Sequence, residues 1–272
     1  LWIPVPQSNE VQTISNLNVN SDGLQYEIKD ETKHNNKYLY VYSNKGTTQT
    51  KTVELSFDVT RTEHSNVEYA NVNPGNYLKA SSMVPVGFIF NLIIDNNNLN
   101  NSDIRGIYDY VLTGMHYGKP TDDKNSGNYK YVHGGINPKT GKEWLPNNIT
   151  YGLKKKTRDE LAKSQNQNKK YAYGNGNSLY ACDIGVGNCT DYHSYFMSLT
   201  RTLEVPSRFH MGFPIPGGEE GKVKGYHCWA DYYVEGEGWY PVDISEADKD
   251  PSKVEYFFGT VDENRVEMNT GR

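Results

Sequence analysis

Gly187-Asn188-Cys189-Thr190-Asp191-Tyr192-His193 is the stretch of this 272-residue chain that most constrains its fold and function. Beyond Cys189, apolar residues recur at three- and four-residue spacing, as on one face of an α-helix; they are Tyr192, Tyr195, Phe196, Leu199 and Leu203. Val205-Pro206 ends the helix, because proline disfavours helical geometry in the preceding residue and has no amide hydrogen. Asn188 is the predicted N-cap, so Cys189 lies in the first turn, where free backbone N–H groups favour a thiolate.

Two stretches nearer the C-terminus predict a β-hairpin. Residues 226–234 and Trp239 to Asp243 have extended, aromatic-rich patterns, and Glu235-Gly236-Glu237-Gly238 supplies turn residues between them. With a three-residue loop or a bulge, Val234 pairs with Gly238, and Asp243 lies opposite Trp229 and diagonal to His227 on the same face. A two-residue loop would put His227 and Asp243 on opposite faces. We therefore expect an odd loop or a bulge.

Cys189, His227 and Asp243 are the candidate catalytic residues. In this hypothesis, His227 takes the proton from Cys189 and later protonates the leaving amine, while Asp243 fixes the histidine tautomer and stabilises the imidazolium. The backbone N–H of Cys189 faces the developing oxyanion, with a second donor from elsewhere. The three residue types in this arrangement predict acyl-transfer chemistry.

Several further motifs follow in a specific order and spacing from about residue 100 to the end. Besides 187–194, they are Val205-Pro206-Ser207-Arg208-Phe209, His227-Cys228-Trp229-Ala230, residues 238–247, Phe258-Gly259-Thr260 and Glu263-Asn264-Arg265. Together they resemble the bacterial transglutaminase-like cysteine enzymes. The resemblance implies a papain-related α+β core with Cys189 as nucleophile, His227 as base and Asp243 as third member. The superfamily includes cross-linking transglutaminases, peptidases and peptide N-glycanases, so the reaction stays open.

The chain departs from this family by a polar insertion at about residues 119–172. Its Lys, Asn, Gly and Asp residues predict an irregular loop that gates substrate access, with one short helix at the capping-box sequence Thr157-Arg158-Asp159-Glu160. Tyr173-Gly174 stands where the resemblance leads us to expect Trp-Gly. If that tryptophan is the second oxyanion donor, the resemblance implies that Tyr173 replaces it through its hydroxyl.

Residues 1–75 are predicted to form an N-terminal antiparallel, sandwich-like β-domain, and residues 76–272 the catalytic domain. Apolar and polar residues alternate from Thr52 to Thr60, and tyrosines alternate with aliphatic residues from Tyr38 to Tyr42, with a turn at Asn44-Lys45-Gly46. Pro74-Gly75-Asn76 marks the predicted boundary. The next predicted element is a helix that is capped by Ser102 and stopped by Gly118 and Pro120. One face of this helix carries Ile104, Ile107, Tyr108, Val111 and Met115.

Composition excludes several classes of function. A net charge of -5 and a pI near 5.8 give no electrostatic support for nucleic-acid binding. The longest apolar stretch, Met83 to Ile94, falls short of the roughly 20 residues of a membrane span. No metal-ligand spacing is present, and we expect neither a metal nor a cofactor. The Asn- and Tyr-rich composition, the missing initial methionine and the end at Thr270-Gly271-Arg272 suggest an exported bacterial protein cut at both ends.

Alternatives remain open at several positions. His193, four residues after Cys189, is the rival base, and we expect a structural role for it. Asp191 is expected to be a first-turn carboxylate without a chemical role. Cys182 and Cys228 either pair or are small buried residues, and we favour burial.

Two functions are compatible with this sequence. The first is a cysteine enzyme acting on amide bonds of a protein or peptide through a thioester, with hydrolysis preferred over transamidation. The alternative is a catalytically inactive transglutaminase-like module for binding or structure. An intact Cys-His-Asp set argues against the second.

Overall fold

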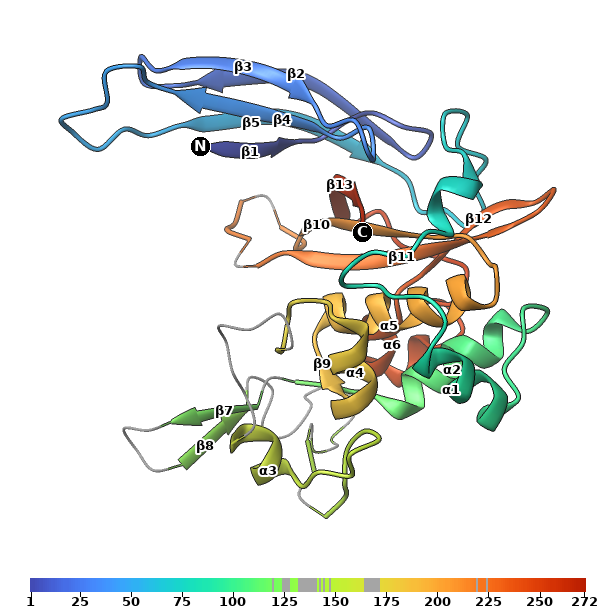
Figure 1. Ribbon diagram of the computed structural model, residues 1–272. Helices are drawn as coiled ribbons and strands as arrows, with labels where there is room; N and C mark the ends of the chain where they lie inside the picture. The colour runs from blue at the N-terminus through green and yellow to red at the C-terminus, as the bar shows by residue number, and fades with distance from the viewer. Residues whose placement is uncertain are drawn as a thin grey trace.

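The computed structural model describes residues 1–118, 120–123, 128–131, 141, 143, 145–146, 148–163, 172–218, 220–223 and 225–272. N-terminal antiparallel sheets lie over one face of a four-stranded antiparallel sheet, and helices cover its other face (Figure 1). This arrangement is the mixed α+β architecture predicted from the sequence.

Two small antiparallel sheets form the N-terminal part. The first has the order β1-β4-β3, and the second pairs β2 with β5; the bounds are β1 (Trp2–Val5), β2 (Gln12–Asn20), β3 (Gln25–Asp30), β4 (Lys37–Tyr42) and β5 (Glu54–Arg61). Leu39 and Val41 are buried and pack with Val19 and Leu55 from the other sheet. The predicted alternation in β4 and β5 is therefore confirmed. The turn near Gly46 leads from β4 in one sheet to β5 in the other, so these two strands do not pair. An alternating pattern identifies the buried face of a strand but does not identify its partner strand.

The central sheet has the strand order β12-β11-β10-β13. Its strands are β10 (Ser207–Pro214), β11 (His227–Val234), β12 (Gly238–Val242) and β13 (Arg265–Gly271). Val234 pairs with Gly238 and Ala230 with Val242, so three residues form the hairpin loop and the predicted register is confirmed. Gly238 has a φ of 103°, and a Cβ there would lie 2.7 Å from the carbonyl oxygen of Val67.

The helix after Cys189, α5 (Cys189–Thr202), packs across the central sheet with its apolar face buried against β11 (Figure 1). Other helices surround it; they are α1 (Ile89–Asn97), α2 (Ile104–Gly114), α4 (Ser178–Ile184) and α6 (Ile244–Lys249), with short 3-10 turns η1 (Pro74–Tyr77) and η2 (Pro251–Lys253). Asn188 is the N-cap of α5, as predicted.

Both ends of α2 differ from the prediction. Asp103, and not Ser102, caps the helix by accepting from the N–H of Gly106, since both residue types are good N-caps and sequence alone does not rank them. The helix ends at Gly114, before the predicted stop at Gly118. The next residues form β6 (His116–Tyr117), which pairs in parallel with β9 (Val186–Gly187), and this pairing requires extended backbone.

The described parts of the 119–172 insertion contain more structure than predicted. A hairpin of β7 (Pro120–Asp123) and β8 (Asn128–Tyr131) is present, so the expectation of an irregular loop is wrong there. The predicted short helix is α3 (Arg158–Lys163), and its capping box is formed, because Thr157 N–H donates to Glu160 Oε2 at 2.8 Å. Much of the insertion lies outside the described residues, and its gating role stays a prediction.

Side-chain amides from the N-terminal part bind the outer edge of β13. Gln12 accepts from the N–H of Glu267 at 2.8 Å and donates to its carbonyl oxygen at 3.0 Å. Asn36 does the same with Thr270, at 2.8 and 2.7 Å. Each amide reproduces the two hydrogen bonds that a neighbouring strand would make.

Buried charges lie between the N-terminal part and the central sheet. Arg208 donates to Asp231 at 2.7 Å, and His210 lies between Asp231 at 2.9 Å and Glu267 at 2.5 Å. His210 also stacks on Trp229 with ring centroids 5.5 Å apart. Burial opposes ionisation of Asp231, but Arg208 and His210 outweigh it and lower its pKa. Removing the charge of the acidic side chains or of the basic side chains would leave a buried charge without its partner.

Replacing Asp231 with Asn is expected to destabilise the protein by about 3 kcal/mol, because the guanidinium of Arg208 loses its charged partner in a buried site. Urea unfolding followed by fluorescence measures this. Asp30→Asn is the matched control, since its ion pair with Lys37 is exposed and we expect little change. Equal midpoints for the two variants would contradict the argument.

Candidate active site

The first turn of α5 is buried, and most of its backbone donors have hydrogen-bond partners. The side chain of Asn188 accepts from the N–H groups of Thr190 at 3.0 Å and Asp191 at 3.4 Å, and the carboxylate of Asp191 accepts from the N–H of Asn188 at 3.1 Å. Among the residues that the structure describes, none accepts a hydrogen bond from the N–H of Cys189. This donor therefore remains for a bound oxyanion.

Asp191 makes more contacts than its position in the first turn predicts. Its carboxylate also accepts from the N–H groups of Gly174 at 2.8 Å and Gly176 at 2.9 Å, which fixes the loop carrying Tyr173 to the start of α5. Burial raises the pKa of Asp191 to about 7 in spite of these donors. No local pattern of residues indicates this role, because the loop and the helix meet only in the fold.

His227 and Asp243 are joined by a short hydrogen bond. His227 Nε2 lies 2.6 Å from Asp243 Oδ2, and the same oxygen accepts from Arg265 at 2.9 Å. Asp243 is fully buried. Burial opposes its ionisation, but His227 and Arg265 outweigh it and hold the pKa of Asp243 far below its usual range. Burial would also lower the pKa of His227, but Asp243 reverses this and raises it to about 9.

Cys189 completes this group from the neighbouring helix. Its thiol is hydrogen-bonded to both His227 and Cys228, and only 2% of the residue is exposed. The hydrogen bond with Cys228 is the largest cause that lowers the pKa of Cys189 well below its ordinary value; burial opposes it and His227 adds to it. Since Asp243 occupies Nε2 of His227, Nδ1 is the nitrogen that remains for the thiol. The structure thus brings the three predicted residues together.

His193, the rival base, is hydrogen-bonded on both ring nitrogens. Nδ1 lies 2.7 Å from the carbonyl oxygen of Cys189, and Nε2 accepts from the N–H of Ile244 at 3.1 Å. These contacts require the neutral tautomer with its proton on Nδ1. Burial lowers the pKa of His193, although Asp243 lies 3.9 Å away. His193 thus links α5 to α6 through two backbone hydrogen bonds, and its structural role stays a prediction.

All three cysteines are free and buried, so the favoured interpretation of Cys182 and Cys228 is confirmed. Cys182 lies on α4, where burial raises its pKa to about 12. Cys228 follows His227 on β11 and contacts the hydroxyl of Thr190 at 3.4 Å, and burial raises its pKa well above the ordinary value. Of the three thiols, that of Cys189 is the one whose pKa is lowered.

Tyrosines surround the start of α5. Tyr173 is half-buried, burial raises its pKa, and its hydroxyl is close enough to Cys189 and Asp191 to interact electrostatically with both. Tyr117 interacts with Cys189 in the same way. The hydroxyl of Tyr226 accepts from the side chain of Asn188 at 3.0 Å and lies 3.4 Å from the hydroxyl of Thr190. Asn188 and Thr190, the residues on both sides of Cys189, thus contact the hydroxyl of the exposed Tyr226.

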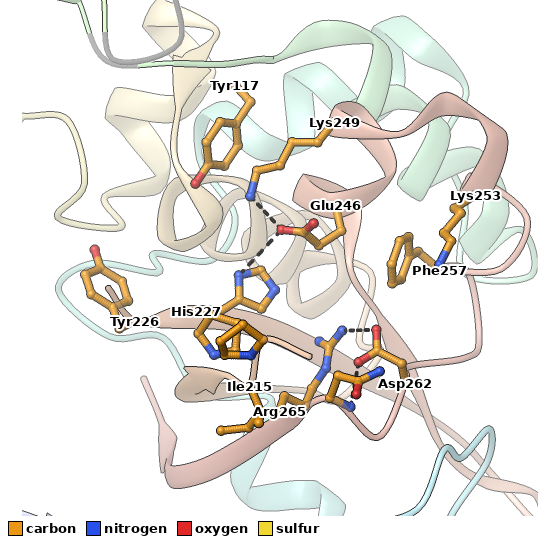
Figure 2. A pocket seen from close by; sticks show the side chains of 13 residues that line it. Tyr117, Ile215, Tyr226, His227, Glu246, Lys249, Lys253, Phe257, Asp262 and Arg265 are labelled. Carbon is orange, nitrogen blue, oxygen red and sulfur yellow. Dashed lines mark hydrogen bonds and ion pairs between the residues drawn. The ribbon is translucent and has the colours of Figure 1, made fainter. Parts of the chain in front are cut away.

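A pocket of about 550 Å³ opens beside His227 (Figure 2). Glu246 Oε1 lies in it, 3.9 Å from His227 Nδ1 and 2.5 Å from Lys249 Nζ. Arg265 forms another part of the wall and connects Asp243 to Asp262. Arg265 and Glu246 belong to motifs that carry the family resemblance, but the sequence assigned them no function.

The part of the chain that the structure describes contains no group of three or more His, Cys, Asp or Glu side chains arranged to hold a metal ion. In the same described residues, none of the helices combines the length and apolar character that crossing a bilayer requires.

This chain is similar to one family model and to one bacterial protein. Residues 137–244 match the family model described as Transglutaminase-like superfamily. An uncharacterized protein of Haemophilus influenzae is 22% identical over 318 residues, which cover 100% of this chain and 74% of that protein.

Two solved structures are also similar to this chain. The first, described as a "Putative Cysteine Protease" from Cytophaga hutchinsonii, is 12% identical with a TM-score of 0.54, covering 99% of this chain and 75% of that one. This likeness supports the fold. The second, the periplasmic domain of TgpA from Pseudomonas aeruginosa bound to ethylmercury, is 13% identical with a TM-score of 0.39, covering 93% and 72% of the two chains.

Asp191→Asn is expected to destabilise the protein by about 1–3 kcal/mol, because one carboxylate oxygen is replaced by an amide NH₂ that faces backbone donors. Chemical unfolding measures the loss, and protease sensitivity of the segment around Tyr173 reports release of the loop. Asp103→Asn is the control, since asparagine caps α2 as well as aspartate does. An unchanged midpoint in Asp191→Asn would show that the loop is held by other contacts.

Proposed function

We propose that this chain, which contains a transglutaminase-like superfamily domain, is a cysteine-dependent acyl-transfer enzyme acting on amide bonds of proteins or peptides. One observation carries the proposal: His227 is bonded to Asp243 through Nε2 at 2.6 Å and to the thiol of Cys189 on its other side. The lowered pKa of Cys189 and the raised pKa of His227 favour a thiolate–imidazolium pair at neutral pH.

In the proposed mechanism the thiolate of Cys189 attacks the amide carbon and forms a tetrahedral intermediate. The imidazolium of His227 gives its proton to the nitrogen, the C–N bond breaks, and the amine leaves a thioester on Cys189. Neutral His227 then takes a proton from water, and the resulting attack on the thioester releases the acid and the thiolate. Asp243 stays ionised throughout and holds the ring by its Nε2 proton.

Oxyanion stabilisation is assigned to the backbone N–H of Cys189 and the hydroxyl of Tyr173. The first donor is supported by the position of Cys189 at the start of α5, where the helix dipole also favours negative charge. The second is supported by the electrostatic interaction between Tyr173 and Cys189 and by the fixation of its loop to Asp191.

The pocket beside His227 supports the assignment of a peptide substrate, because its walls are both apolar and charged and lie next to the proposed base. We prefer hydrolysis over transfer to an amine, since water is always present as acceptor. An extracytoplasmic location stays a prediction.

The inactive binding module is the second candidate, and one observation favours it: Cys189 is only 2% exposed. A substrate must therefore gain access past the residues around the start of α5. Reactivity of the thiol towards a small reagent separates the two candidates.

At pH 6, iodoacetamide is expected to label Cys189 faster than Cys182, because the pKa of Cys189 is lowered and that of Cys182 is raised to about 12. His227→Ala should slow labelling of Cys189 at least about tenfold, since the thiolate loses its counter-ion. Peptide mass mapping gives both rates. His64→Ala, a histidine that pairs with Val261 away from the site, is the control. Equal rates for Cys189 and Cys182, unaffected by His227→Ala, would favour the inactive module.

The reaction itself is tested with a peptide library, with and without a primary amine, in the presence of wild-type protein or Cys189→Ser. We expect cleavage or deamidation products that are absent with Cys189→Ser, and their masses distinguish these from amine adducts. Amine adducts as the main product would replace hydrolysis by transamidation. Turnover by Cys189→Ser equal to that of the wild type would exclude the proposed nucleophile.

A further inference from the structure

Cys228 is a buried thiol that the proposed mechanism does not use. It follows His227 on β11, and its side chain belongs to the apolar cluster between the sheet and α5. It is fully buried, and its sulfur is hydrogen-bonded to that of Cys189. A helix and a strand distant in sequence thus bring two thiols close enough to interact.

The surroundings fix this pair of thiols in place. The hydroxyl of Thr190 contacts the sulfur of Cys228 at 3.4 Å, and Thr190 is itself held by Asn188 through its backbone. The contact joins the first turn of α5 to the strand that begins at His227. The packing of α5 on β11 therefore holds the two cysteines beside each other, and a disulfide forms between cysteines whose Cα atoms lie within about 7 Å.

The two thiols also differ in reactivity. The pKa of Cys189 is lowered and that of Cys228 is raised, so a single thiolate lies beside a protonated thiol. A low-pKa cysteine next to a second cysteine is the arrangement of peroxide-sensitive sites, in which the neighbour resolves the first oxidation product. Cys182 has no such neighbour, since its hydrogen-bond partner is the hydroxyl of Tyr195.

We propose that Cys189 and Cys228 form a reversible oxidation site that reacts with hydroperoxides and closes to an intramolecular disulfide. The inference rests on the proposed function in that it takes Cys189 to be the reactive thiolate. Closure of the disulfide removes the nucleophile, and reduction by a thiol restores it.

Each step of the oxidation balances. The thiolate of Cys189 attacks one oxygen of hydrogen peroxide, the O–O bond breaks, and the released hydroxide takes the proton of the His227 imidazolium to form water. The sulfur of Cys228 then attacks the sulfenic acid on Cys189, the S–O bond breaks, and the leaving hydroxide takes the thiol proton as a second water molecule. Peroxide is reduced by two electrons, and the two thiols are oxidised to the disulfide.

The test uses the full chain treated with a small excess of hydrogen peroxide. We expect the intact protein to lose the mass of two hydrogen atoms, peptide mapping to give a Cys189–Cys228 cross-link, and iodoacetamide labelling of Cys189 to stop. Dithiothreitol should restore labelling to near its starting level. A cross-link involving Cys182, or persistent absence of any cross-link while Cys189 is oxidised, would overturn the proposal.

Cys228→Ser and Cys228→Ala supply the second arm. Without the resolving thiol, peroxide should add one and then two or three oxygen atoms to Cys189, and dithiothreitol should no longer restore labelling after the later stages. Cys182→Ser is the matched control and should behave as the wild type. Reversible recovery in folded Cys228 variants equal to that of the wild type would overturn the inference, and circular dichroism verifies folding.

Cross-link mapping needs no substrate, so this test is independent of acyl transfer. A Cys189–Cys228 cross-link in a protein that turns over no peptide would remove the proposed enzyme function and keep the oxidation site. Peptide turnover without the cross-link would remove the oxidation site and keep the enzyme.

Discussion

The site depends on one constraint: the polar first turn of α5 is buried, and nearly every donor in it is satisfied. Asn188 and Asp191 cap each other, and Asp191 also holds the neighbouring loop through two glycine N–H groups. The approach is so close that a Cβ on Gly187 would lie 2.5 Å from that of Asp191. Buried donors must be paired, so the helix can begin only where these partners converge. Cys189 takes its position from that convergence, and its N–H has no acceptor among the residues that the structure describes.

The charge distribution around His227 follows from the second role of Asp243. This residue ends the hairpin and is also the N-cap of α6, so its carboxylate accepts from the backbone of Glu246 as well as from His227 and Arg265. An acid with so many donors remains anionic, and it raises the pKa of the histidine beside it. His193 lies close to the same carboxylate, but its two backbone contacts hold it in the neutral form. Two histidines near one carboxylate thus have different protonation states.

The sequence predicted local features better than contacts between distant segments. The N-cap of α5 and the register of Val234 with Gly238 follow from nearby residue types and from the loop length that puts His227 and Asp243 on one face. The capping of α2 was misassigned because two adjacent residues suit the position. The binding of Asp191 to a loop, and the contact of Cys228 with Cys189, join segments that no periodicity relates. Such contacts arise from packing, which a single sequence does not encode in any local pattern.

The amides of Gln12 and Asn36 have a consequence for solubility and assembly. An uncovered edge strand offers free donors and acceptors to any extended chain that meets it, and copies of one protein then associate strand to strand. In this molecule the side-chain amides of Gln12 and Asn36 bind the backbone groups of β13 at two positions. No further strand can pair with β13 there. The N-terminal sheets therefore protect the edge of the central sheet: a version of this chain lacking them would retain Cys189, His227 and Asp243 and yet be prone to aggregate.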